Sequence, residues 1–224
     1  MAFSPLRITW RLDTPWVPPA KGLHLDGLIA HALVQRALQD EQSLSDDASF
    51  DSLLADLPFE RHEGANGWCW KASLLQVSVI GSERRYMTTK TPSQSIAEWT
   101  ALGVISPKGG AKVDTVRGLY KAGAMHYPLE HVDTIHAWCV GDPDVIADLL
   151  SDIPALGLKT RLGHGRLTET DGMRFEMNED AQAMTNWTLR NMPDEIDGYL
   201  PVAGPLRSPY WLRSAEQIVW RPTC

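Results

Sequence analysis

The chain has 224 residues, of which 43% are hydrophobic and 22% are charged, and its formal net charge is −7 at pH 7. This is the composition of a globular protein of one domain, so extensive disorder is excluded. The acidic balance argues at first against a polyanionic ligand. No stretch approaches the roughly 20 apolar residues that cross a bilayer, so we expect no membrane partner. The first residues also lack the pattern of a signal peptide.

Cysteine and histidine spacing gives no sign of a metal or other cofactor. The cysteines are few, widely spaced and without a C-x-x-C pair: Cys69, Cys139 and Cys224. This pattern is typical of a reduced, cytoplasmic protein without a zinc site. Three histidines follow one another at intervals of five, which is not the spacing of a helical zinc pair: His126, His131 and His136.

The first half of the chain predicts a strand, a helix and a second strand. Apolar residues alternate with polar ones over residues 6–17, which predicts a half-buried strand. Apolar residues then recur at helical spacing over residues 25–38, and Asp26 lies in the first turn, where it suits the helix dipole. Residues 39–66 are acidic and predict surface loop with a short helix near Leu53. Residues 67–80 predict a strand.

The second half begins with a segment that lacks periodicity. Residues 81–127 are rich in glycine and contain two prolines, so we expect an extended hairpin or an irregular insertion with a function. A strand is predicted over residues 134–140. Asp142 as N-cap and Pro143 at the first position predict a helix that Pro154 and Gly157 end. A strand over 168–177 and an extension of strands and loops over about 178–224 follow.

The order of these elements predicts the fold class. Strand, helix, strand, insertion, strand, helix and strand give βαββαβ, the ferredoxin-like α+β arrangement. We therefore expect a single domain over residues 1–224, with an insertion at about 81–127 and a C-terminal extension at about 178–224. Because this fold serves many functions, the function must come from its sites.

Charge is distributed unevenly along the chain. Residues 81–126 have a net charge of +4 and residues 157–166 have +3, whereas the remainder has −14. Arginine and lysine on loops predict a phosphate-binding face, and neighbouring aromatic rings can stack unpaired bases. The alternative is a solvated surface with scattered charge. The cations of the first segment are Arg84, Arg85, Lys90, Lys108, Lys112, Arg117 and Lys121, and the aromatic residues in or next to it are Tyr86, Trp99, Tyr120 and Tyr127.

The second basic segment contains a more specific pattern, which we call the glycine loop (residues 158–167). Gly157 alone would satisfy the end of the preceding helix, so two further glycines exceed the need of a turn. The loop is neither a Walker motif nor a dinucleotide fingerprint. We predict contact with phosphate or RNA backbone, with a plain turn as the alternative. The residues expected to make this contact are Lys159, Arg161, Gly163, His164, Gly165 and Arg166.

Three motifs together resemble the RAMP superfamily of CRISPR proteins. Residues 163–167, Gly-His-Gly-Arg-Leu, are similar to the family's glycine-rich loop before its last strand. Residues 23–33 resemble the first strand-to-helix junction of the family. Residues 114–121 resemble a basic insertion of the Cas5-like, handle-binding subunit of type IV CRISPR effector complexes. The resemblance covers about residues 5–177 and implies a ferredoxin-like fold.

The resemblance also implies a role and partners. Such a subunit holds the 5′ handle of the guide crRNA and caps the backbone filament beside the large subunit. Its insertion acts as a thumb that contacts the neighbouring backbone RAMP subunit, near the place where target DNA is read next to the protospacer-adjacent motif. The glycine loop would contact RNA phosphates. The handle or the thumb would be lined by Arg84, Arg85, Lys90, Lys108, Lys112, Arg117, Tyr120 and Lys121.

Two other function classes remain open. Some RAMP relatives are metal-independent endoribonucleases that process the repeat of pre-crRNA, and histidine suits this chemistry because its pKa is near neutrality. We expect His24 to be exposed and His31 to be partly buried; a nuclease would use His24, or His126 with Tyr120 and Lys121. Because the sequence fixes no partner for these histidines, we favour a non-catalytic subunit. The third class is a regulatory or small-molecule-binding module without affinity for RNA.

Overall fold

The computed structural model describes residues 2–40, 52–89, 92–105 and 121–223. The chain divides into two compact units, each of which we describe by itself. The main unit contains the described residues up to 81 and from 130 onward, and the second unit contains those between 82 and 129. Within the described part of the chain, no helix is long and apolar enough to cross a membrane.

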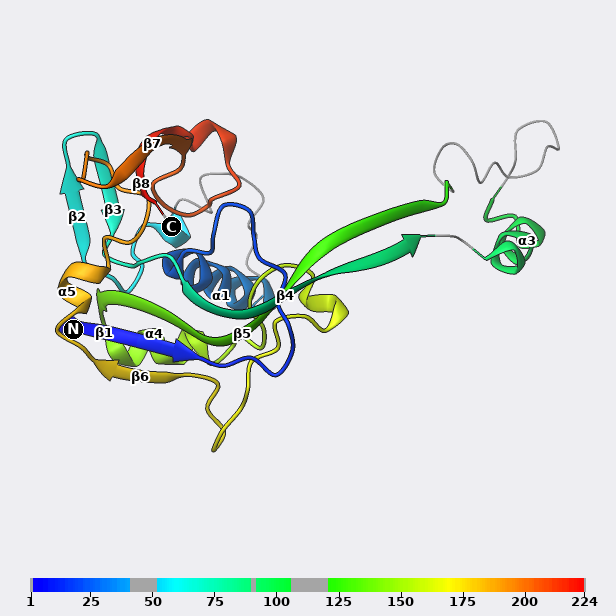
Figure 1. Cartoon of the computed structure of the whole chain (residues 1–224), viewed down its shortest axis with the longest axis horizontal. Coiled ribbons are helices and arrows are strands. Elements are labelled where there is room, and N and C mark those ends of the chain that lie inside the picture. The colour runs from blue at the N-terminus through cyan, green and yellow to red at the C-terminus, as the bar shows by residue number, and fades with distance from the viewer. Residues whose placement is uncertain (1, 41–51, 90–91, 106–120, 224) are drawn as a thin grey trace. The chain divides into compact units, whose positions relative to one another are not determined.

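The chain is a mixed α+β protein with antiparallel sheets (Figure 1). A four-stranded sheet has the order β4-β5-β1-β6, and two further sheets pair β2 with β3 and β7 with β8. The elements are β1 (Ser4–Trp10), α1 (Leu25–Gln39), β2 (Arg61–Gly64), β3 (Gly67–Trp70), β4 (Gln76–Thr89), α3 (Ser93–Ala101), β5 (Gly123–Gly141), α4 (Pro143–Leu150), β6 (Glu176–Glu179), α5 (Ala183–Asn186), β7 (Tyr199–Gly204) and β8 (Gln217–Pro222).

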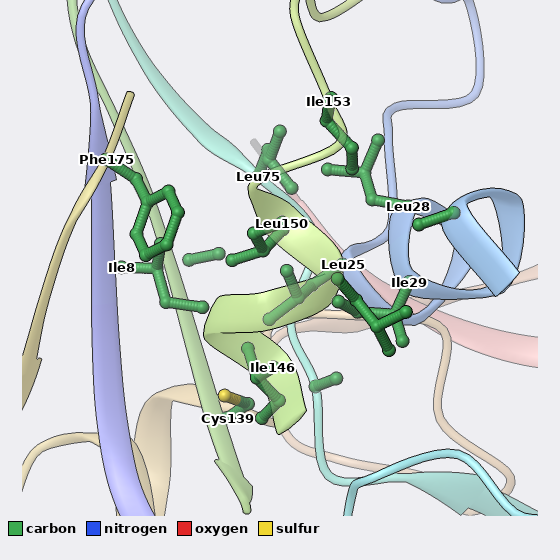
Figure 2. Close-up of a cluster of buried hydrophobic side chains, with 14 of the residues drawn as sticks. Ile8, Leu25, Leu28, Ile29, Leu75, Cys139, Ile146, Leu150, Ile153 and Phe175 are labelled. Carbon is green, nitrogen blue, oxygen red and sulfur yellow. The ribbon is translucent and has the colours of Figure 1, made fainter. Parts of the chain in front are cut away.

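The core of the main unit lies between the four-stranded sheet and two helices, α1 and α4 (Figure 2). Alternate residues of β1 are buried, because successive side chains of a strand point to opposite faces. Ile8 on β1 pairs with Ala137 on β5, and both are buried. Leu25 and Ile29 of α1 and Ile146 of α4 complete this layer. One face of the sheet therefore carries the helices and the apolar core.

The two helices of the core confirm the sequence patterns, with one correction. Asp142 caps α4, since its Oδ1 accepts hydrogen bonds from the amides of Asp144 at 3.1 Å and Val145 at 3.2 Å. The helix ends at Leu150 with Ser151 as C-cap, earlier than predicted. Gly157 is therefore not the cap. It has φ +90, and a Cβ there would lie 2.8 Å from the carbonyl oxygen of Val17.

Several predicted strands have different bounds. The first ends at Trp10, because beyond it only isolated bridges form and Pro15 has no amide to donate. The strand predicted over residues 67–80 is divided into β3 and β4. The backbone amides of the residues between them donate hydrogen bonds to other segments, as Ser73 does to Trp138 and Leu74 does to Leu189. The strand predicted over 134–140 is part of the longer β5. The strand predicted over 168–177 begins only at Glu176 and continues to Glu179 as β6. Helix α3 was not predicted.

The C-terminal part of the chain packs onto the main unit through a second apolar cluster. Trp187 and Met192 contact Cys69 of β3 and Val140 of β5, and all four side chains are buried. Antiparallel strands β7 and β8 follow, in agreement with the predicted strands and loops. The residues after β6 are thus an integral part of the main unit.

Candidate functional site

A cavity of about 1010 Å³ lies in the main unit beside the glycine loop. This volume is at the upper end of ordinary ligand pockets, which measure about 300–1,000 Å³. One wall is helix α1, with Leu28, His31 and Gln35, and another is the glycine loop, with Arg161 and Arg166. We call this space the loop cavity.

The backbone conformation of the glycine loop explains why glycines stand at positions 163 and 165. Residues 160–162 form one turn of 3-10 helix, flanked by Lys159 and Gly163 in the left-handed region at φ 57 and φ 85. Gly165 also has a positive φ of 66, and a Cβ there would lie 1.9 Å from the carbonyl oxygen of Leu156. No side chain fits at this place. Gly165 is therefore required by the turn itself.

Hydrogen bonds fix the loop to neighbouring segments. The amide of Gly163 donates to the carbonyl of Thr160 at 2.9 Å, and that of Gly165 to Pro15 at 3.0 Å. The amide of Arg166 donates to the hydroxyl of Thr14 at 2.9 Å. The sequence favoured amides that approach phosphates, but these amides already have partners. Of these three residues, Arg166 is the one that still offers a ligand a charged side chain.

The cations of the loop cavity differ in their partners. Arg174 pairs with Glu169 at 2.9 Å, and Asp152 pairs with Arg36 on α1. Arg161 and Arg166 are exposed, and neither forms an ion pair with any residue that the structure describes. Their charge is thus available to an anion that enters the cavity.

The exposures of His24, the N-cap residue of α1, and of His31 within α1 are the reverse of the prediction. His31 is exposed and lines the loop cavity. His24 is buried and stacks on Tyr210, with ring centroids 4.0 Å apart. Burial, then the charges of Arg190 and Arg221, hold the pKa of His24 well below its usual value. The prediction that His24 is exposed is therefore wrong. The histidine of the glycine loop, His164, is buried as well.

A buried ionic network connects α1 to the C-terminal extension. The side chain of Arg190 is fully buried and donates to Asp26 Oδ2 at 3.4 Å and to the hydroxyl of Tyr210 at 2.8 Å. Tyr210 in turn donates to Asp26 at 2.8 Å. Burial raises the pKa of Asp26, and Arg190 and Tyr210 oppose that rise. Asp26, predicted only to suit the helix dipole, is thus a partner of residues that the sequence did not single out.

The second unit holds the other predicted residues that are described. Arg84 and Arg85 on β4, Lys121 and His126 are exposed. His126 lies near Tyr86, with ring centroids 6.1 Å apart. Tyr127, predicted to stack bases, is buried, so its ring is not available for this role. Five predicted residues lie outside the described part of the chain: Lys90, Lys108, Lys112, Arg117 and Tyr120.

None of the described His, Cys, Asp and Glu side chains forms a group of three or more that could hold a metal ion. Cys69 and Cys139 are free and buried, and burial raises the pKa of each thiol.

Comparison with known proteins decides the family. The sequence matches the family of CRISPR type IV associated protein Csf3 over residues 4–222, nearly the whole chain. The chain belongs to the Csf3 family. Membership makes it a Cas5-like subunit of a type IV CRISPR complex, a kind of subunit that is generally non-catalytic. The match extends past β6 to the end of β8, so the Csf3 family includes the segment that contributes Arg190 and Tyr210. A search of curated proteins found no match.

Proposed function

We propose that this Csf3-family chain is a non-catalytic RNA-binding subunit that holds the 5′ handle of the guide crRNA at the loop cavity. One observation carries the proposal: Arg161 and Arg166 are exposed beside the cavity and form no ion pair with a described residue. Guanidinium groups bind phosphates through two parallel N–H donors, so two unpaired arginines suit an RNA backbone.

The strand order supports a ferredoxin-like RAMP fold for this subunit. In the order β4-β5-β1-β6, β1 lies between β5 and β6 and is antiparallel to both. Helix α1 connects β1 toward β4, and α4 connects β5 toward β6. This is the order expected of a βαββαβ unit whose four sheet strands are β1, β4, β5 and β6.

The second unit supplies the proposed contact with the rest of the complex. Its exposed cations, Arg84, Arg85 and Lys121, suit the handle or the thumb that meets the neighbouring backbone subunit. We place the large subunit and target DNA, near the protospacer-adjacent motif, among the partners of the assembled complex. Membership of the Csf3 family and the charge of the segment support these proposed roles.

Histidine placement separates the binding role from the nuclease alternative. His24 is buried with a lowered pKa, so it does not meet a substrate proton at the surface. His31 is exposed in the loop cavity and is the histidine that a repeat-cleaving nuclease would use there. Incubation of the purified chain with repeat RNA in the absence of metal tests this. Products that His31→Ala abolishes would contradict the non-catalytic role.

Affinity measurements test the binding role. Fluorescence anisotropy with a labelled repeat RNA compares the wild type with Arg161→Gln/Arg166→Gln. We expect weaker binding, because two phosphate contacts are lost. Arg11→Gln/Arg213→Gln is the matched control, since it removes the same charge from exposed arginines that do not line the loop cavity. Equal affinities of the two double variants would refute this site.

A further inference from the structure

Two arginines and two tryptophans form a stack on the main unit, outside the loop cavity. The Cζ atoms of Arg61 and Arg207 lie 4.5 Å and 4.1 Å from the centroid of the Trp68 ring. Arg61 also lies 5.0 Å from the centroid of Trp70. Two guanidinium groups, from β2 and from the loop after β7, therefore pack over one indole. We call these four residues the arginine–tryptophan stack.

The charges of this stack are not neutralised by the described part of the chain. Arg61 and Arg207 are exposed, and neither forms an ion pair with a described carboxylate. Glu63 lies opposite Trp68 in the register of β2 and β3, yet it pairs with neither arginine. An arginine that packs by its face keeps the N–H donors at its edge for an anion. Among the bonds within the described residues, Arg61 donates to the carbonyl of Ala55.

Buried contacts hold the stack in place before any ligand binds. Arg190 donates to the carbonyl of Trp70 at 2.6 Å and also to the carbonyl of Leu206, the residue before Arg207. One buried guanidinium thus ties together the strand that carries the tryptophans and the loop that carries the second arginine. A ligand therefore does not have to order these segments, which lowers the cost of binding.

We propose that the arginine–tryptophan stack is a second anion site that binds the phosphodiester backbone of a nucleic acid. The choice of nucleic acid rests on the proposed function, since a guide RNA and a target DNA are the polyanions of such a complex. Both present the same phosphate chemistry to the two arginines. Neither arginine belongs to the glycine loop or lines the loop cavity, so the two sites can be tested separately.

The salt dependence of binding tests this second site. The full chain is titrated against a single-stranded repeat RNA and, separately, a duplex DNA at several salt concentrations. For each lost phosphate contact, the slope of log affinity against log salt changes by about 0.7 for a single strand and about 0.9 for a duplex. Arg61→Gln/Arg207→Gln is therefore expected to reduce the slope by about 1.4 with RNA or about 1.8 with DNA.

The controls separate this proposal from the other site. Arg11→Gln/Arg213→Gln removes equal charge elsewhere, and Arg161→Gln/Arg166→Gln tests the loop cavity. Arg207→Gln alone keeps Arg61 and its bond to Ala55 and is expected to give half the change in slope.

The probe whose slope changes identifies the bound strand. Slopes equal to those of the control with both probes would overturn the second site, as would lost affinity at an unchanged slope. In either case, a loss of RNA binding in Arg161→Gln/Arg166→Gln would still support the loop cavity as the site of the proposed function.

Discussion

Arg190 and the two arginines of the loop cavity, Arg161 and Arg166, differ in how far the described residues compensate their charge. Arg190 is fully buried, and its donors reach a carboxylate, a hydroxyl and backbone carbonyls. Arg161 and Arg166 are exposed, and no described carboxylate neutralises them. The first charge is already compensated by the fold, so it stabilises structure. The other two are left for a ligand.

The largest effect is expected at the buried member of this comparison. Arg190→Met leaves Asp26 as a buried carboxylate without its cation, which typically lowers the free energy of unfolding by about 3–5 kcal/mol. Urea unfolding followed by circular dichroism measures this loss. Arg161→Met is the control and should change stability by less than about 0.5 kcal/mol, as most surface substitutions do. A similar stability of the two variants would remove the distinction between the arginines.

The next effect concerns the glycines that shape the loop. Gly165→Ala places a Cβ against the carbonyl of Leu156 at a positive φ, so we expect a loss of about 2–4 kcal/mol in unfolding free energy. Gly163→Ala has a similar φ but meets no atom within 4 Å. It should lose only about 1–2 kcal/mol, the cost of the left-handed conformation. Thermal unfolding of both variants sharpens the comparison, and an equal loss would contradict the close contact at Gly165.

The smallest effect is a dependence of stability on pH at His24. The folded pKa is lowered by burial, then by Arg190 and Arg221, so below about pH 6.5 the unfolded chain binds a proton that the folded chain does not. Stability should therefore fall as the pH decreases from about 6.5, by at most about 1.4 kcal/mol per pH unit. The variant His24→Phe keeps Asp26 and Tyr210, which lie beside His24. It should lose the part of the dependence of unfolding free energy on pH that is due to His24. An unchanged pH profile in His24→Phe would contradict the lowered pKa.

Local sequence signals predicted the two core helices, α1 and α4. The periodicity of α1 and the cap at Asp142 depend on residues close in sequence, and both are confirmed. The glycine loop was found in the same way, from glycines and arginines within ten residues. The sequence could not show that the amides of Gly165 and Arg166 are already hydrogen-bonded, because their partners Pro15 and Thr14 are about 150 residues away in the chain.

Contacts between distant segments account for what sequence reasoning missed. Asp26 meets Arg190 and Tyr210 from the other end of the chain, and no local pattern marks that pairing. Tyr210 also covers His24, which explains why His24 is buried although we expected it to be exposed. Arg61 and Arg207 likewise meet only through the packing of the C-terminal extension.

Ultraviolet crosslinking of the assembled complex, followed by mass spectrometry of the crosslinked peptides, tests the central claim most directly. If the loop cavity holds the 5′ handle, handle nucleotides should crosslink to peptides that contain residues 158–167 or His31, and Arg161→Gln/Arg166→Gln should reduce these crosslinks. Handle crosslinks that occur only elsewhere on the chain, at a yield that the double variant does not change, would contradict the account.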